Sequence, residues 1–253
     1  MKINCLPIIL AAGLGTRLGT KRGNNSKCLL DINGKSLILY QLDNLNKLGF
    51  KEVVIVLGFK GQDFKNLIGD QYKELKIIYV ENKLYECSGS AFSIFVSKEV
   101  WEGNKKPMLL LHGDIFYDPS ILLGALNHKK DNHIVLDERY STLTGDELLV
   151  IGEKELVSGL TKDPSKGKKI AGESLGINIW SIDFLNDYFS FLSSILKKEG
   201  KHLNWEPTIA PFLKQFPSLN LYYSGIKGRE WININYQEDL DMAVNELHPR
   251  IYL

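Results

Sequence analysis

The 253-residue chain lacks several features that would place it in a specialised class of protein. Its three cysteines, Cys5, Cys28 and Cys87, are widely spaced and odd in number, so neither a disulfide framework nor a cysteine-based metal site is expected. No apolar run approaches membrane-spanning length, and the first apolar run begins too early for a signal peptide to precede it. These absences predict a soluble, cytoplasmic protein with reduced cysteines.

The chain also lacks an excess of charge of either sign. It has 31 Lys and Arg against 30 Asp and Glu, a formal net charge of +1, so neither nucleic acid nor an anionic membrane is expected as a partner. Any affinity for phosphate must come from local clusters. The 44% of hydrophobic residues can form a sizeable core. There is no internal repeat, low-complexity tract or proline-rich linker, so one domain is expected.

What is present is a glycine-rich stretch between residues 8 and 27, after an apolar run that is typical of a buried strand. Glycines allow a backbone to approach a ligand closely and to present N–H groups to it. The cations that follow, Arg17 and Lys27 among them, suit a polyphosphate. An ordinary turn remains the alternative. No Gly-Lys-Ser/Thr follows, which excludes a P-loop, and Gly19 lies one place too late for a dinucleotide-binding G-x-G-x-x-G.

Apolar periodicity predicts strands and helices that alternate through the first half of the chain, as in a mainly parallel sheet covered by helices. The predicted strands before residue 115 are 7–10, 52–58, 76–81 and 108–112, and the predicted helices are 36–48, 62–68 and 91–100. Further along, we predict strands at 133–137, 172–180, 219–223 and 231–235, a hairpin over 147–160, and helices at 182–198 and 204–216.

Two further positions have patterns that suit a ligand. Ser88-Gly89-Ser90 precedes a predicted helix and offers free N–H groups, although a plain N-cap by Ser88 or Ser90 explains it equally well. Asp114 follows a buried strand, at the end where open α/β sheets bind ligands. Its alternative role is to cap the turn before Pro119. The apolar run before Gly113-Asp114 favours the ligand-binding role.

The sequence LAAGLGTRLG, followed after Lys27 by CLLDINGKSLILYQLDNL, resembles the signature of nucleotidyltransferases that activate small phosphates with an NTP. The resemblance extends along almost the whole chain. It implies an α/β, Rossmann-like three-layer αβα sandwich with a mixed, mainly parallel central sheet, of the GT-A-like kind. Residues 1–253 are then a single nucleotidyltransferase domain, with its nucleotide-binding half at about 1–120 and its acceptor-binding half at about 121–253.

The resemblance also implies roles for individual residues. Arg17 would bind the leaving β,γ-phosphates, Lys27 the α-phosphate or the acceptor phosphate, and Asp114 the catalytic Mg²⁺. Lys162, before Asp163-Pro164, stands where the family carries a lysine directed at the acceptor phosphate. The residues implied in nucleotide binding are Leu10, Ala11, Ala12, Gly13, Gly15, Thr16, Ser88 and Gly89.

The acceptor pocket resembles that of phosphocholine-type cytidylyltransferases, in which aromatic rings enclose a quaternary ammonium. The implied acceptor-binding residues are Glu147, Glu173 in a GE-x-x-GI-like stretch, Trp205 and Glu206. Glu147 stands where those enzymes have a tryptophan of the cage. A carboxylate suits a primary ammonium or an amide better than trimethylammonium, which favours phosphoethanolamine, an aminoalkylphosphonate or a phosphorylated amino acid.

The chain departs from the family pattern at two further positions. Ser26 replaces the proline that usually precedes the lysine, and Asn235 replaces the aspartate that is usually a second Mg²⁺ ligand. An amide carbonyl can still coordinate Mg²⁺, and some sugar-phosphate uridylyltransferases of the superfamily use asparagine there. These departures predict a looser loop and weaker metal binding.

We therefore expect a Mg²⁺-dependent cytidylyltransferase whose partners are CTP and a small phosphorylated acceptor. The Lys-, Asn- and Ile-rich composition suggests an AT-rich bacterium, where cytidylyltransferases act on phosphoglutamine in capsule phosphoramidate synthesis. One alternative is a sugar-1-phosphate nucleotidyltransferase that uses dTTP, UTP or GTP. Another is a nucleotide-binding regulator without catalysis, because of Ser26 and Asn235. The sequence leaves a homodimer open.

Overall fold

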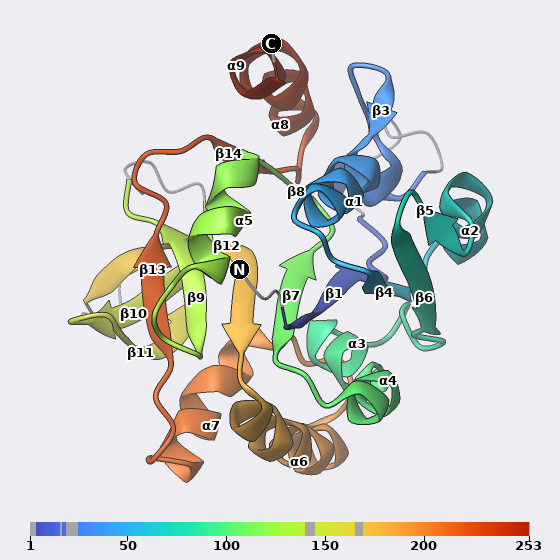
Figure 1. The fold of residues 1–253 in the computed structure, drawn as a ribbon. Coiled ribbons are helices and arrows are strands. Elements are labelled where there is room, and N and C mark those ends of the chain that lie inside the picture. The colour runs from blue at the N-terminus through green and yellow to red at the C-terminus, as the bar shows by residue number, and fades with distance from the viewer. Residues whose placement is uncertain (1–3, 16, 19–24, 140–144, 165–168, 253) are drawn as a thin grey trace.

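The fold is that of a computed structural model, which describes residues 4–15, 17–18, 25–139, 145–164 and 169–252. Its centre is a ten-stranded sheet (Figure 1). In spatial order the strands are β10 (Leu149–Glu153), β11 (Leu156–Thr161), β13 (Tyr222–Gly225), β9 (His133–Asp137), β12 (Ile170–Trp180), β7 (Met108–His112), β1 (Leu6–Ala11), β4 (Glu52–Leu57), β6 (Leu75–Glu81) and β5 (Gln71–Tyr72).

The sheet is mixed, and its parallel part lies mostly in the N-terminal half of the chain. Strands β7, β1, β4 and β6 pair in parallel, as do β9 and β13. β12 runs antiparallel to both of its neighbours, β7 and β9, and its register with β9 shifts between Ser174 and Asn178. The expected mixed α/β fold is confirmed.

Helices cover both faces of the sheet because successive strand residues point to opposite sides. On β1, Ile8 packs in a core with α3 (Ser90–Val96), α4 (Lys98–Asn104), α6 (Ile182–Glu199) and α7 (Ile209–Gln215). Its neighbour Ile9 packs in a second core with α1 (Leu37–Lys47), α2 (Gly61–Ile68) and α5 (Pro119–Leu126). These are the three layers that were expected (Figure 1).

A third, smaller core joins the C-terminal segment to the edge of this body. It contains residues of α8 (Gln237–Met242), the π-helical turn η4 (Ala243–Leu247) and α9 (His248–Tyr252). Two short pairs of antiparallel strands contribute to it. One is the hairpin of β2 (Asp31–Ile32) and β3 (Lys35–Ser36), and the other pairs β8 (Ile115–Tyr117) with β14 (Trp231–Asn233), which lies far along the chain. In the described part of the chain, no helix is long and apolar enough to cross a membrane.

Two predicted helices are divided in the structure. The one predicted at 91–100 breaks into α3 and α4 at Ser97, whose hydroxyl donates to the carbonyl of Ile94 at 2.7 Å. Such a local side-chain bond competes with the helical ladder. The helix predicted at 204–216 begins as the 3₁₀ turn η3 (Glu206–Thr208) before α7.

Candidate active site

A cavity of about 1120 Å³ opens beyond the carboxyl ends of the parallel strands. Residues that follow β1, β6 and β7 form one side of it, which is where open α/β sheets bind ligands. Most of the predicted site residues line it. These are Leu10, Ala11, Ala12, Gly13, Gly15, Arg17, Lys27, Ser88, Gly89, Asp114, Glu147, Lys162, Glu173, Glu206 and Asn235. Thr16 lies outside the described residues, and Trp205 does not line the cavity.

The glycine loop begins where β1 and β7 end side by side. The N–H of Gly113 donates to the carbonyl of Leu10 at 3.0 Å, and a Cβ on Gly113 would lie 2.7 Å from the Cys28 sulfur. A Cβ on Gly13, in contrast, would meet no atom within 4 Å. The backbone is therefore closely packed at Gly113 and leaves open space at Gly13, where a ligand can approach it.

Lys27 lies at the start of the 3₁₀ turn η2 (Lys27–Leu29), and only 7% of it is exposed. Its ammonium donates to Oδ1 of Asn235 at 2.8 Å and lies 3.6 Å from Oδ2 of Asp114. Burial and then the charge of Arg17 lower the pKa of Lys27, although the charge of Asp114 acts in the opposite direction. One buried ammonium thus joins the nucleotide loop to both predicted metal ligands.

The same contacts test whether the residues fit Mg²⁺. A carboxylate oxygen of Asp114 and the amide oxygen of Asn235 converge on one cationic group, and hard oxygens are the ligands that Mg²⁺ prefers. Asp239 accepts the backbone N–H groups of Asn235 and Tyr236, both at 2.7 Å, and so fixes this turn. The described residues hold no cluster of three or more Asp, Glu, His or Cys suited to a metal. The fit is to an ion that keeps several waters or phosphate oxygens.

Asp146, which the sequence did not indicate, connects three separate segments. Its carboxylate lies 2.7 Å from the Arg17 guanidinium and 4.0 Å from the Lys162 ammonium, and it accepts the Tyr236 hydroxyl. The hydrogen bond from Tyr236 and the charge of Arg17 lower the pKa of Asp146. The two cations expected to bind phosphates therefore share one counter-ion at the cavity wall.

Carboxylates gather on the acceptor side of the cavity. Burial, then the charges of Glu147 and Asp137, raises the pKa of Glu173 to about 7. Burial also raises the pKa of Glu206, whose carboxylate accepts the Ser90 hydroxyl at 3.5 Å. No lysine or arginine of the described residues forms an ion pair with Glu173. This side of the cavity is acidic and partly dehydrated.

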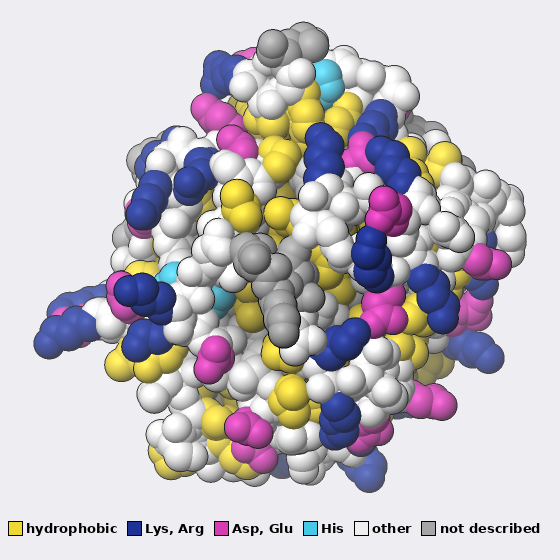
Figure 2. All heavy atoms as spheres, in the orientation of Figure 1, with side chains coloured by type: hydrophobic (Ala, Val, Ile, Leu, Met, Phe, Trp, Pro, Cys, Tyr) yellow, Lys and Arg dark blue, Asp and Glu magenta, His cyan; other side chains and the backbone are white. Residues whose placement is uncertain are grey.

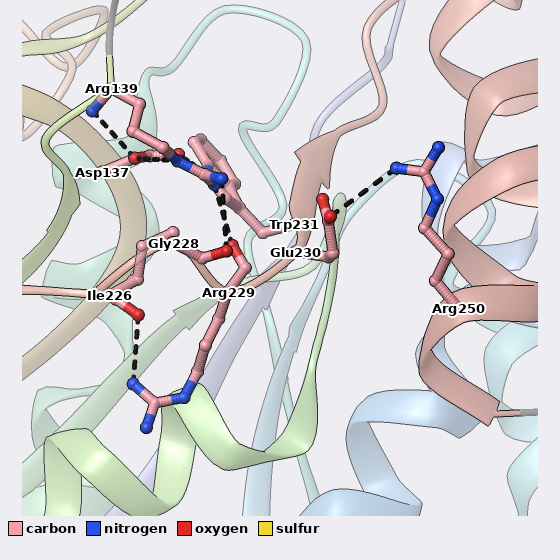
Figure 3. A network of polar contacts seen from close by, with 8 residues as sticks. All are labelled: Asp137, Arg139, Ile226, Gly228, Arg229, Glu230, Trp231 and Arg250. Atoms are coloured by element: carbon pink, nitrogen blue, oxygen red, sulfur yellow. Dashed lines mark hydrogen bonds and ion pairs between the residues drawn. The ribbon is translucent and has the colours of Figure 1, made fainter.

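A polar network behind this wall holds Asp137 (Figure 3). Arg139 donates to both carboxylate oxygens of Asp137 at 3.0 Å and also to the carbonyls of Gly228 and Arg229. The Trp231 indole N–H donates to the same carboxylate at 2.9 Å. The network fixes the end of β9 against the segment that leads into β14, and Trp231 itself lines the cavity.

Two of the predicted ligand-binding residues have structural contacts of their own. Trp205 is fully buried and is not among the residues that line the cavity. Its indole N–H donates to Nε2 of His112 at 3.0 Å. Gly89 lines the cavity, but a Cβ on it would lie 2.2 Å from the carbonyl oxygen of Leu203. A glycine is required at position 89 because the backbone of Leu203 approaches it closely, whether or not Gly89 also contacts a nucleotide.

Residues 7–158 match the family model of the MobA-like NTP transferase domain. The chain belongs to this family. The protein is accordingly a nucleotidyltransferase.

Curated relatives extend the similarity beyond the matched domain. The CTP:phosphoglutamine cytidylyltransferase of Campylobacter jejuni is 22% identical over 94% of this chain and 99% of its own length. The D-glycero-alpha-D-manno-heptose 1-phosphate guanylyltransferase of the same organism is 30% identical over 72% of this chain and 78% of its own. The CMP-5'-(3-aminopropyl)phosphonate synthase of Streptomyces rubellomurinus is 31% identical over 46% of this chain, and the match spans only 18% of that protein.

Solved structures share the fold over the whole chain. The inositol-1-phosphate CTP transferase of T. maritima matches with a TM-score of 0.77 at 21% identity, over 97% of this chain and 95% of that one. The CTP:phosphocholine cytidylyltransferase of Streptococcus pneumoniae matches with a TM-score of 0.72 at 21% identity, over 97% of this chain and 100% of that one.

Proposed function

We propose that the protein is a Mg²⁺-dependent cytidylyltransferase that transfers CMP from CTP to a small phosphate carrying an amine or amide. The observation that carries the proposal is the pair of carboxylates on the acceptor side, Glu147 and Glu173, with the pKa of Glu173 raised to about 7. An acceptor with a primary ammonium would compensate the charge of Glu173, which forms no ion pair with a described lysine or arginine, whereas a neutral sugar would not.

The chemistry asks little covalent participation of the protein. An oxygen of the acceptor phosphate attacks the α-phosphorus of CTP in line, the bond to the bridging oxygen breaks, and pyrophosphate leaves. The acceptor phosphate is already ionised, so no side chain has to remove a proton. The residues bring the anions together, hold them in line and offset the charge that develops on the leaving group.

Each cation has a place in this scheme. Arg17 would bind the leaving pyrophosphate, Lys27 the α-phosphate or the acceptor phosphate, and Lys162 the acceptor phosphate. The triphosphate would displace Asp146 from Arg17. When bound, Mg²⁺ supplies charge neutralisation, and Asp114 and Asn235 would hold it.

The charge balance of the cavity supports a need for metal. Of the described residues, three cationic side chains line it, against seven carboxylates. The carboxylates are Glu86, Asp114, Asp146, Glu147, Glu173, Glu206 and Asp239. A triphosphate and a second phosphate add further negative charge, and like charges in a partly dehydrated site repel strongly. The three cations alone do not offset this total.

The choice of CTP is supported by the relatives and structural neighbours whose names specify CTP or CMP. Several of their names also specify acceptors that carry nitrogen, which agrees with the acidic wall. We propose that the product of this chain serves bacterial surface polysaccharides, including capsules, and that the reaction takes place in the cytoplasm. The second candidate is a sugar-1-phosphate nucleotidyltransferase, which is favoured by the 30% identity to a heptose 1-phosphate guanylyltransferase.

A panel of the four NTPs and dTTP with candidate phosphates, monitored by pyrophosphate release with Mg²⁺, tests the proposal. We expect release with CTP and with phosphoethanolamine, an aminoalkylphosphonate or phosphoglutamine. Glucose 1-phosphate and heptose 1-phosphate are the matched acceptors without nitrogen. Release with a sugar phosphate and none with CTP and any amine would establish the second candidate instead.

The same assay tests whether the chain is a regulator without catalysis. We expect Asp114→Ala and Lys27→Ala each to reduce turnover by about 10²-fold or more, because each removes a partner of the transferring phosphate. Glu153→Gln, on the exposed end of β10, is the control. Nucleotide binding without turnover at any Mg²⁺ concentration would favour the regulator.

A further inference from the structure

His112 is a polar residue of the cavity wall to which no role has yet been assigned. It ends β7, two residues before Asp114, and its half-buried side chain lines the cavity. The indole N–H of Trp205 donates to its Nε2 at 3.0 Å. Because an indole nitrogen can only donate, Nε2 must be the acceptor. In this arrangement Nδ1 is the ring nitrogen that can donate a hydrogen bond.

The surroundings fix the orientation of this ring. The fully buried ring of Trp205 meets it edge-on, at an interplanar angle of 89°, and the backbone N–H of Trp205 donates to the Ser90 hydroxyl at 3.0 Å. On the other side, Gly176 has a φ of +78°, and a Cβ there would lie 2.5 Å from Cγ of His112. The shift in register of β12 between Ser174 and Asn178 includes this glycine. Bulges of this kind commonly reorient groups next to active sites.

The second nitrogen of the ring is left available. In the described part of the chain, Nδ1 of His112 has no hydrogen-bond partner, and it is not among the buried polar atoms that lack one. On a residue that lines the cavity, Nδ1–H is therefore a donor without a partner among the described residues. An oriented donor of this kind is a typical specificity element in a small-molecule site.

We propose that Nδ1–H of His112 donates a hydrogen bond to a carbonyl or carboxylate oxygen in the organic part of the acceptor. This inference rests on the proposed function, which it narrows to acceptors that carry such an oxygen beside their nitrogen. The ring packs on β12, the strand that carries Glu173, so it belongs to the acceptor side. The donor and the carboxylates then recognise opposite parts of an amino-acid or amide group.

Trp205 acts in this proposal as a positioning residue. Its indole N–H holds Nε2, which keeps the proton on Nδ1 and the ring in place. Through this bond, Trp205 would influence the cavity although it does not line it. It also predicts that the loss of the Trp205 indole N–H changes acceptor recognition.

The test measures three quantities for each variant: KM for the acceptor, the affinity for Mg²⁺-NTP by calorimetry without acceptor, and the unfolding midpoint. His112→Phe keeps a ring and removes the donor, so we expect the KM of phosphoglutamine to rise about 10-fold or more while NTP affinity is unchanged. The preference for phosphoglutamine over phosphoethanolamine should fall by the same factor. In His112→Asn the amide N–H can replace Nδ1–H, so this variant should recover part of that preference.

Trp205→Phe should raise the KM of phosphoglutamine several-fold. Its matched control is Trp101→Phe in α4. This change removes an indole N–H that donates to the carbonyl of Lys106 at 2.7 Å, and it should change stability only. An unchanged KM in His112→Phe or in Trp205→Phe, or an equal loss of NTP affinity, would overturn the inference.

Failure of the proposed function would look different. If the wild type reacts only with a sugar phosphate, the acceptor class is wrong. If an amine-bearing acceptor reacts and its KM is the same in wild type and His112→Phe, only the proposed role of His112 is wrong. If His112→Phe does not fold, Trp205→Phe measured against its control Trp101→Phe supplies the comparison.

Discussion

Ser26 occupies a place in the cavity wall where the resembling enzymes carry proline. It is 1% exposed, and among the described residues its hydroxyl has no hydrogen-bond partner except the thiol of Cys28, which is a weak one. Its φ of −69° is the value that a proline ring imposes. A buried hydroxyl without a good partner lowers the free energy of unfolding.

We therefore predict that Ser26→Pro stabilises the protein by about 1 kcal/mol, because it removes this hydroxyl and restricts the unfolded chain. Urea unfolding measures the difference, and Ser26→Ala separates the contribution of the hydroxyl from that of the ring. The matched control is Ser97→Ala, which deletes a buried hydroxyl that does have a partner, the carbonyl of Ile94 at 2.7 Å, and should destabilise. A destabilised Ser26→Ala would mean that the Cys28 contact matters.

The candidate site could be predicted from the sequence only where residue type and local pattern identify a position. Arg17, Lys27 and Asp114 stand in a signature, and all three line the cavity. Asp146 could not be predicted, because its partners lie far along the chain at Arg17 and Tyr236. The burial of Trp205 could not be predicted either, because aromatic type alone does not distinguish a ring in the cavity wall from one that packs behind it.

At the scale of elements, the turn before α3 depends on one close backbone approach. The N–H of Gly89 donates to the carbonyl of Lys201 at 2.8 Å, and that of Ala91 to the carbonyl of Leu203 at 3.2 Å. The turn and the segment 201–204 therefore form one unit at the edge of the cavity. Neither can shift without moving the other, since the atoms in contact are backbone.

We predict that Gly89→Ala destabilises the protein by about 1–3 kcal/mol, since the added Cβ meets a carbonyl that cannot rotate away. Denaturant unfolding gives the value. Gly103→Ala is the control: it lies inside α4, a Cβ there meets nothing within 4 Å, and alanine should stabilise that helix by about 0.5–1 kcal/mol. Equal stability of wild type and Gly89→Ala would show that the turn and segment 201–204 are free to separate.

Elements with long apolar patterns were predicted well, and short or locally ambiguous ones were not. β1, β4, β6 and β7 lie where the apolar runs place them, because buried parallel strands need such runs. The short strands β5 and β8 and the helix α5 were missed. α5 begins with Asp118 as N-cap and Pro119, a start signal that the sequence contains but that was assigned to a turn. Pairing order, such as β9 beside β13, depends on tertiary contacts that no local pattern specifies.

At the scale of the whole molecule, a net charge close to zero conceals an excess of negative charge at the cavity. On the face in Figure 2, basic and acidic side chains are interspersed, as a net charge of +1 suggests. The cavity wall differs, because its carboxylates outnumber its cations among the described residues. A site that binds two phosphates but has more carboxylates than cations depends on cations that the ligands bring. The ammonium of the acceptor is one of them, and its contribution to binding should depend on pH.

The pKa of Glu173, raised to about 7, determines the direction of that pH dependence. An ammonium pairs with the carboxylate form, so we predict that the KM of an amine-bearing acceptor falls as pH rises from about 6 to about 8. Steady-state kinetics with saturating CTP and Mg²⁺ measures it. Glu173→Gln should raise the KM and remove this part of the dependence, whereas Glu86→Gln, also in the cavity wall, should retain it.

Wild type and Glu173→Gln have to be compared because the acceptor phosphate itself ionises near pH 6, which changes the KM of both enzymes in the same way. Stability provides an independent check with a definite sign. The pKa of Glu173 is raised from 4.5, so the stability that its neutral form contributes is present below about 4.5 and is lost as pH rises through about 7. Glu173→Gln should therefore gain stability relative to the wild type between pH 5 and pH 8. A constant difference would mean that Glu173 is ionised throughout, and the acceptor KM should then not respond to it.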